Sequence, residues 1–232
     1  MVDVSTQPAL FYPCCGDDLH TPIELFAPFV HEFWFADLHF FTGEQPDRIP
    51  HLLHDIRWTL LDIQITRWDV EMTETGDPKP GEVAPILRSE YYEDFSTGDV
   101  IAVHRRKGYA VSALHKHISQ LGVFFYRGDN WQKNHGSGLL WNTPHRTNHW
   151  GHIDDVLDWL VDGGLYVTDG SNCIRTKNPY APLAQFRDQY IGIEAVQLAQ
   201  PFETDRARFE CVGYAGHRYG PTLIWQVWKK HG

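Results

Sequence analysis

The chain has 232 residues and a formal net charge of −10, and its composition of 42% hydrophobic, 14% aromatic and 22% charged residues is that of a globular protein, not of a disordered or fibrous one. The acidic balance makes nucleic acid an unfavourable partner, because binding to phosphates depends on Lys and Arg. No apolar run approaches the roughly 20 residues that span a bilayer, so we expect no membrane partner.

Length and cysteine content give two further expectations. A chain of 232 residues fits a single domain over residues 1–232. The first fifteen residues lack the basic start and apolar core of a secretory signal, and four cysteines, two of them adjacent, make a poor disulfide framework. We therefore expect a cytoplasmic protein with reduced thiols.

The N-terminal part predicts a strand, a helix and a second strand. Residues 9–15 form a short apolar and aromatic run, which is typical of a buried strand. Thr21, Pro22 and Glu24 then supply a helix cap, a first-turn proline and a capping-box acid. A second aromatic run ends at Asp37, so the segment resembles the opening of a parallel α/β sheet.

Residues 58–98 break this alternation of strands and helices. Apolar side chains two apart predict a strand over 58–70, and the Gly- and Pro-rich stretch 74–85 predicts an exposed loop. We expect 58–98 to be a β-rich insertion that is peripheral to the parallel core.

Alternation returns in the second half of the chain. Apolar stripes at helical spacing predict helices over 109–120, 153–161 and 183–191, and Gly163-Gly164 is expected to end the second of them. Apolar runs between the helices predict strands that begin at Leu121 and Leu165.

Two apolar runs near the C-terminus, 208–214 and 222–228, predict an antiparallel hairpin. Together the elements predict an α/β fold. It would be a three-layer, Rossmann-like domain with a mostly parallel sheet, the C-terminal antiparallel hairpin and the β-rich insertion.

The order of these elements resembles that of the class I S-adenosylmethionine-dependent methyltransferases. The segment Asp162-Gly163-Gly164-Leu165-Tyr166-Val167 is similar to the glycine pair that this family places before its fifth strand. The resemblance implies S-adenosylmethionine as the cofactor, although the glycine loop of the family is reduced here to the single Gly16. The residues that we expect to bind the cofactor on this basis are Cys14, Gly16, Asp17, Asp18, Asp37 and Arg105.

The resemblance also implies a place for the methyl acceptor. In the family the loop after the fourth strand faces the substrate, which makes Arg127 and Asp129 the candidate catalytic residues. Arg105 and Arg127 favour an anionic group on the ligand, as does the N-terminus of the helix near Thr21. We therefore expect a small-molecule ligand that carries a carboxylate or a phosphate.

Two other functions remain open from the sequence. A metal-dependent hydrolase could use the acids and histidines of the first two loops, which are Asp17, Asp18, His20, Asp37 and His39. A non-catalytic domain could have kept the fold and lost the cofactor, as the single-glycine loop suggests. The histidines His145, His149 and His152 have a spacing that suits zinc if a helix runs through them. Pro144 and Gly151 disfavour a continuous helix, and chance clustering among fourteen histidines is the favoured explanation, so we assign no metal ligand.

Overall fold

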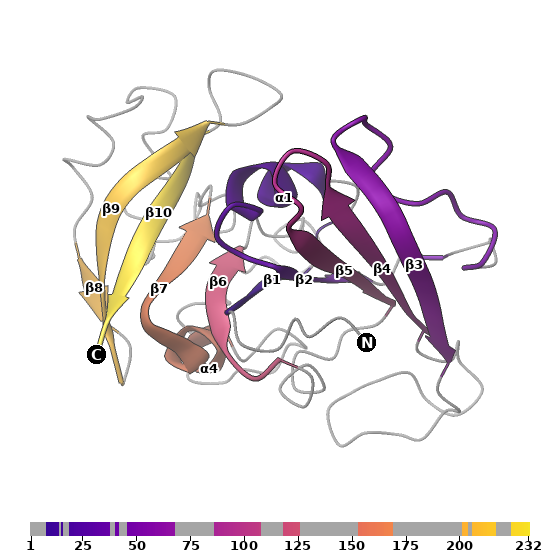
Figure 1. Cartoon of the computed structure of the whole chain (residues 1–232). Helices are drawn as coiled ribbons and strands as arrows, with labels where there is room; N and C mark the ends of the chain where they lie inside the picture. The colour runs from indigo at the N-terminus through magenta and orange to yellow at the C-terminus, as the bar shows by residue number, and fades with distance from the viewer. Residues whose placement is uncertain are drawn as a thin grey trace. The chain divides into compact units, whose positions relative to one another are not determined.

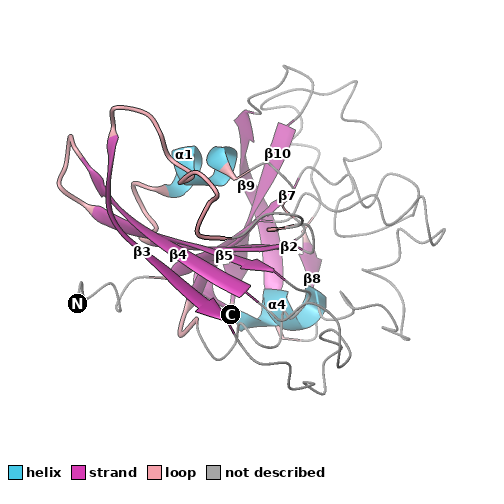
Figure 2. Cartoon of the chain, turned by 90° about the vertical axis from the view of Figure 1, so that its right-hand side faces the viewer, coloured by secondary structure: helices cyan, strands magenta, loops and turns pink. Residues whose placement is uncertain are grey.

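The computed structural model describes residues 8–13, 15, 19–37, 40–41, 46–67, 86–107, 118–125, 153–168, 201–203, 206–216 and 224–232. The chain divides into two compact units, unit 1 over residues 1–120 and unit 2 over residues 121–232. Strands dominate the described part of both units (Figure 1 and Figure 2).

Unit 1 contains a mixed sheet with the strand order β3-β4-β5-β2-β1. β2 pairs in parallel with both β1 and β5, whereas β4 runs antiparallel to both β5 and β3. The elements of this unit are β1 (Ala9–Pro13), α1 (His20–Phe26), β2 (Glu32–Asp37), β3 (Trp58–Arg67), β4 (Ile86–Asp94) and β5 (Val100–Lys107).

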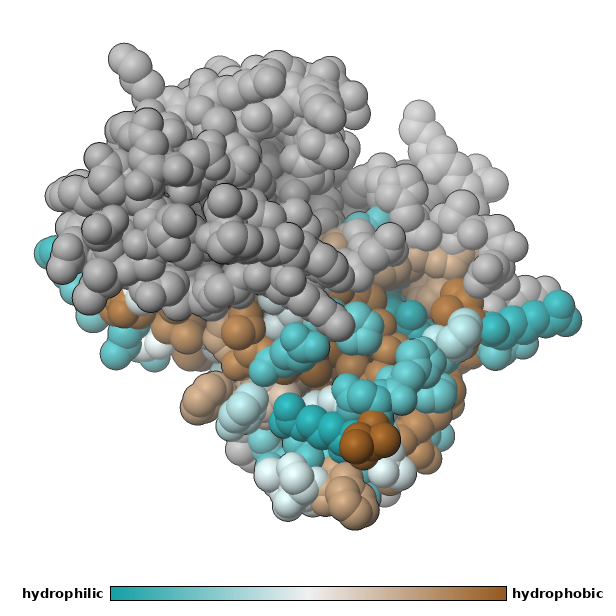
Figure 3. Space-filling model, turned by 90° about the horizontal axis from the view of Figure 1, so that it is seen from above, coloured by the Kyte–Doolittle hydropathy of each residue, from teal (hydrophilic) through white to brown (hydrophobic). Residues whose placement is uncertain are grey.

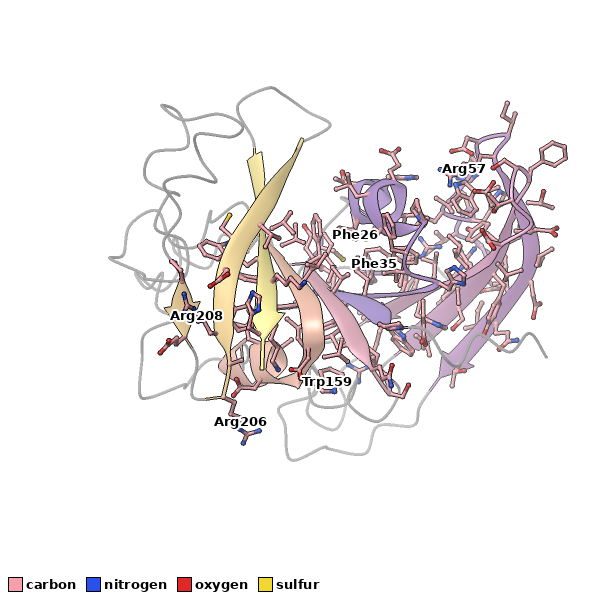
Figure 4. The ribbon with its side chains drawn as sticks, turned by 60° about the vertical axis from the view of Figure 1, so that its left-hand side comes forward. Phe26, Phe35, Arg57, Trp159, Arg206 and Arg208 are labelled. Carbon is pink, nitrogen blue, oxygen red and sulfur yellow. The ribbon has the colours of Figure 1, made fainter. Side chains whose placement is uncertain are left out.

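The predicted strand–helix–strand unit near the N-terminus is present as β1, α1 and β2. All five residues of β1 are buried, which explains its unbroken apolar run. Phe26 on α1 lies on the side of the helix toward β2 and Phe35, as Figure 4 shows, and both side chains are buried. The predicted cap is wrong, because Thr21 lies inside α1 and the N-cap is Leu19, with no side-chain hydrogen bond.

β4 and β5 are joined by a tight turn that depends on Asp94. The Asp94 carboxylate accepts hydrogen bonds from the Ser96 N–H at 2.9 Å and from the Ser96 hydroxyl at 2.6 Å. It also pairs with Arg57, whose Nε lies 2.7 Å away. Gly98 completes the turn with a φ of 75°, a left-handed conformation that favours glycine.

The Asp94 contacts predict a loss of stability in acid. Hydrogen bonds from Ser96 and the charge of Arg57 outweigh burial and lower the pKa of Asp94 to about 2 from its ordinary value of 3.8. The stabilisation is therefore complete above about pH 4 and is lost as the pH falls through 2. At pH 5, Asp94→Asn should lower the free energy of unfolding by about 1 kcal/mol, a modest figure because Arg57 is partly exposed and its charge is screened.

Thermal unfolding between pH 5 and pH 2 tests this expectation. The difference between the wild type and Asp94→Asn should close toward pH 2. Asp99→Asn, which changes an exposed acid in the same turn, serves as the control and should follow the wild type. A constant difference across this range would contradict the assignment.

Unit 2 contains the strand order β6-β7-β10-β9-β8. β6 and β7 pair in parallel, whereas β10 is antiparallel to both β7 and β9, and β8 is antiparallel to β9. The antiparallel pair β9 and β10 matches the hairpin strands that the sequence predicts. The elements are β6 (Leu121–Phe125), α4 (Ile153–Trp159), β7 (Leu160–Thr168), β8 (Phe202–Glu203), β9 (Arg208–Gly216) and β10 (Ile224–His231).

α4 passes directly into β7 without an intervening loop. We predicted that the helix would run to 161 and end at Gly163-Gly164, but it ends at Trp159 and both glycines lie inside β7. Lys230 on β10 contacts this junction: its Nζ donates 2.6 Å hydrogen bonds to the carbonyl oxygens of Asp158, in the last turn of α4, and of Leu160, the first residue of β7. The bond to Asp158 satisfies a carbonyl group of the last helical turn, as cationic side chains commonly do at helix C-termini.

β7 contains a bulge around its two glycines. Leu121 of β6 pairs with Leu160, but Val123 pairs with Leu165, so residues 161–164 lie opposite the single Gly122. Gly163 has a φ of 78°. The glycine pair therefore serves the bulge and not a helix end.

The expected three-layer α/β architecture is wrong. The described residues are mostly in strands, the pairing is mixed parallel and antiparallel, and the two helices α1 and α4 have seven residues each. The helices predicted over 109–120 and 183–191 fall largely or wholly outside the described residues. The physical reason in unit 1 is that 58–98 supplies β3 and β4, which extend the sheet from β5 by antiparallel pairing.

A few large apolar side chains of unit 1 are exposed. Phe29, Ile56 and Phe95 are examples, and hydrophobic residues lie among hydrophilic ones on the face seen in Figure 3. Single exposed apolar residues are ordinary on protein surfaces. None of the helices in the described ranges has both the length and the apolar character needed to cross a membrane.

Candidate functional site

The three parallel strands of unit 1 end at one edge of the sheet. β1, β2 and β5 run in the same direction, with Pro13 beside Ala36 and Asp37 beside Lys107. We call this edge the carboxyl edge. Ligands of open sheets with parallel strands bind outside such an edge, which makes it the first candidate for a site.

The segment that leaves β1 is held against the end of β2. Cys15 is buried, and its Sγ lies 3.9 Å from the carbonyl oxygen of Ala36, the residue before Asp37. The segment after the first strand and the acid that ends the second strand therefore lie close together. Cys14 and residues 16–18, the other expected members of this loop, lie outside the described residues.

Asp37 has a defined position on this edge. It is the last residue of β2 and is only 8% exposed. Side chains alternate along a strand, so Asp37 shares a face with Phe35, whose register partner is Arg105. A carboxylate at the end of such a strand can accept hydrogen bonds from two neighbouring hydroxyl groups of a ligand.

Arg105 belongs to a buried ion-pair cluster on this face. Its guanidinium pairs with Glu90 of β4, and Arg88 Nε lies 2.6 Å from the same carboxylate oxygen, Oε1. The hydroxyl of Tyr92 donates a hydrogen bond to the other oxygen, Oε2. All four side chains are buried. We call Arg88, Glu90, Tyr92 and Arg105 the Glu90 cluster.

The protonation states within the Glu90 cluster follow from these contacts. Burial alone would raise the pKa of Glu90. The charge of Arg105 and the hydrogen bonds from the Tyr92 hydroxyl and the Leu52 N–H lower it by more, so the pKa lies below its ordinary value. Burial, followed by the hydrogen bond to Glu90, raises the pKa of Tyr92 far above its ordinary value. At neutral pH the cluster therefore contains a carboxylate and a neutral phenol.

Sequence reasoning missed most of the Glu90 cluster. Arg88, Glu90 and Tyr92 occupy alternate positions of β4, a pattern that already indicates a polar face on that strand. Their common partner Arg105 is fixed by the register of β4 and β5, in which Arg88 lies opposite Arg105. This register was not visible in the sequence.

A second polar group ties the strands together on the opposite face. Ser89 Oγ lies 2.7 Å from His104 Nδ1, and His104 Nε2 lies 3.5 Å from Glu32 Oε1. The Trp34 ring stacks on the His104 ring at 4.1 Å and donates a 2.8 Å hydrogen bond to Glu32. Because buried polar groups require partners, we interpret this group as structural.

The structure brings together only part of the predicted site. Asp37 and Arg105 lie on neighbouring strands, and His20 is the first residue of α1. Among the described residues no group of three His, Cys, Asp or Glu side chains could hold a metal ion. The expected site residues that lie outside the described residues are Cys14, Gly16, Asp17, Asp18, His39, Arg127, Asp129, His145, His149 and His152.

Comparison with known proteins gives no relative for this chain. No family model, no curated protein and no solved structure matches it. The function must therefore be inferred from the carboxyl edge itself.

Proposed function

We propose that the carboxyl edge of unit 1 binds an adenosine-containing small molecule, with Asp37 accepting hydrogen bonds from the ribose hydroxyls. The observation that carries this proposal is the position of Asp37, which ends β2 beside the segment that leaves β1. The neighbouring parallel strands β1, β2 and β5 support it, because ligands of parallel strands bind outside their carboxyl ends.

Two basic residues support an anionic group on this ligand. Lys107 is the register partner of Asp37, and Arg105 lies two residues earlier on the same strand. Lys107 brings positive charge to the carboxyl edge. Arg105 shares the single carboxylate of Glu90 with Arg88, so the two arginines leave the Glu90 cluster with one excess positive charge. A carboxylate, as in the methionyl part of S-adenosylmethionine, or a phosphate would be attracted there.

We further propose that the ligand is S-adenosylmethionine and that the chain is a methyltransferase of unidentified acceptor. This part of the proposal rests on the strand–helix–strand order of β1, α1 and β2, which the structure retains. The resemblance assigns Arg127 and Asp129 to the acceptor. Bound S-adenosylmethionine would supply a methyl group to an acceptor atom that gives up its proton, leaving S-adenosylhomocysteine. Cys15 and Cys211 form no disulfide bond, which supports a cytoplasmic location.

A ligand screen tests the proposal. A ligand that binds only the folded chain raises its apparent stability, by about 2.7 kcal/mol at one hundred times the Kd. S-adenosylmethionine, S-adenosylhomocysteine, adenosine, ATP and divalent metal ions should be compared by thermal shift and then by calorimetry. If ATP alone binds, the ligand is a nucleotide and not the methyl donor. Stabilisation by metal ions alone would favour the metal-dependent hydrolase. No stabilisation by any adenosine compound would refute the proposal.

The Asp37→Ala variant should weaken binding of S-adenosylhomocysteine by about 1–3 kcal/mol, or roughly 5- to 150-fold in Kd, because a charged hydrogen bond is lost. Calorimetry measures this change. Asp99→Ala is the matched control, since Asp99 is an exposed acid that precedes β5 and lies at the opposite end of the parallel strands. Wild-type affinity in a folded Asp37→Ala protein would remove Asp37 from the site.

A further inference from the structure

The long connection from β2 to β3 is fastened to the Glu90 cluster. It covers residues 38–57, of which 40–41 and 46–57 are described. We call residues 46–53 the strap. Its described residues form neither helix nor strand, and long connections in compact domains are often functional.

The strap is held by hydrogen bonds to buried side chains of β4. The N–H of Leu52 donates to Glu90 Oε2 and to the Tyr92 hydroxyl, each at 2.9 Å, and the N–H of Leu53 donates to the same hydroxyl at 3.2 Å. Arg88 donates to the carbonyl oxygen of Ile49 at 2.7 Å and also to that of Pro46. The strap is therefore fixed at several points along its length by a cluster that is itself inaccessible to solvent.

Phe41 links the start of the same connection to the cluster. It lies four residues after Asp37 and its φ of 60° is left-handed, a conformation that bulky residues rarely adopt. Its side chain is 9% exposed, and its ring centroid lies 6.0 Å from the guanidinium carbon of Arg105. Arg105 in turn pairs with Glu90. Strained backbone of this kind persists where the surroundings enforce it, often near ligands.

We infer that the Glu90 cluster positions Asp37 for the ligand by fastening the chain that follows it. The inference rests on the proposed function of the carboxyl edge. Tyr92, Glu90 and Arg105 are then positioning residues, because they act through the connection and not by touching the ligand. Fixing the connection before binding lowers the ordering cost that binding would otherwise carry.

This arrangement implies a reciprocal coupling. If a fastened strap favours ligand binding, then bound ligand must favour the fastened strap by the same factor. A cluster that only stabilises the fold would change the unfolding transition without making the strap respond to ligand. Hydrogen exchange at the Leu52 and Leu53 amides reports the strap directly, because both N–H groups donate to the cluster.

Tyr92→Phe is the most selective variant, since it keeps the ring and removes only the hydroxyl that accepts hydrogen bonds from the Leu52 and Leu53 N–H groups. We expect faster exchange at both amides and an affinity for S-adenosylhomocysteine that falls about 5- to 20-fold, within the usual range of coupling between sites. In the wild type, S-adenosylhomocysteine should slow exchange at the same amides. Tyr91→Phe is the matched control, because Tyr91 is the adjacent residue and contacts His104 on the opposite face.

A second variant, Phe41→Leu, loosens the contact with Arg105 and leaves the Tyr92 hydroxyl in place. It should weaken binding of S-adenosylhomocysteine in the same direction. A loosened strap in Tyr92→Phe with wild-type affinity for the ligand would overturn the positioning role and leave the proposed function standing. A wild-type protein that binds none of the adenosine compounds would overturn both.

Discussion

Replacing Glu90 with leucine is expected to lower the free energy of unfolding of unit 1 by about 3–5 kcal/mol, the usual cost of removing one partner from a buried ion pair. Glu90 is the acidic member that both Arg88 and Arg105 contact. Without it, two buried guanidinium groups lie next to each other with no opposing charge in the cluster. The Leu52 N–H also loses a carboxylate acceptor.

Chemical denaturation followed by circular dichroism measures this loss. The matched control is the triple variant Arg88→Met, Glu90→Leu, Arg105→Met, which replaces every charge in the cluster by an apolar group of similar size. Because apolar replacement of a whole ion-pair cluster is often close to neutral, the triple variant should be more stable than Glu90→Leu alone. A single variant within about 1 kcal/mol of the wild type would show that the cluster is not a buried ion pair in solution.

The same residue predicts part of the acid sensitivity of unit 1. The pKa of Glu90 is below its ordinary value of 4.5 in the folded chain, so its stabilisation is complete above that value and is lost as the pH falls below it. The triple variant lacks Glu90 and therefore this part of the acid sensitivity. Its stability should therefore fall less steeply between neutral pH and pH 3 than that of the wild type.

Gly164→Ala is expected to destabilise unit 2 by about 1–3 kcal/mol, the usual range for overpacking. An added Cβ would lie 2.7 Å from the carbonyl oxygen of Val161, 3.2 Å from that of Gly122 and 3.3 Å from Leu160 Cδ2. Two of these three atoms belong to the backbone of the bulge and its partner strand, so they cannot move aside as the end of a flexible side chain could.

Gly213→Ala provides the control for this substitution. Gly213 also lies in a strand, β9, and an added Cβ there would meet nothing within 4 Å. Alanine should leave the stability within about 0.5 kcal/mol of the wild type or raise it slightly, because it reduces the freedom of the unfolded chain. Equal thermal unfolding midpoints for Gly164→Ala and Gly213→Ala would contradict the bulge geometry.

The local elements of the fold could be predicted where the apolar pattern is strong. The runs before Cys14 and before Asp37 became β1 and β2, and their parallel pairing follows from the helix between them. The strand from Leu121 and the C-terminal antiparallel pair were likewise visible as apolar segments of strand length. In each case the signal is a run of apolar residues within one segment, which indicates a buried strand without reference to the rest of the chain.

The architecture could not be predicted because it depends on pairing between distant segments. Whether residues 58–98 form a separate insertion or extend the sheet is decided by the antiparallel register of β4 with β5, and no pattern within either strand fixes it. The end of α4 also lies at a long-range contact. Lys230, 70 residues or more away along the chain, donates to the carbonyl oxygens of Asp158 in α4 and Leu160 in β7.

In the candidate site, too, the residues with a local sequence signal were predicted and the contacts between distant segments were not. Asp37 was predictable from its place at the end of an apolar run, and the structure leaves it at the end of β2. Arg105 was also named, but its pairing with Glu90 was not foreseen, since the contact joins β5 to β4. The strap contacts span about 40 residues and had no sequence signal.

The direct passage from α4 into β7 makes this junction intolerant of changes in chain length. Trp159 ends the helix and Leu160 begins the strand, so there is no spare residue to absorb an insertion. One added residue would either rotate the helix by about 100° about its axis or move the start of β7 by one position and exchange its two faces. Homologous chains should therefore vary in length within the bulge at 161–164, or beyond β7, and keep the junction itself constant.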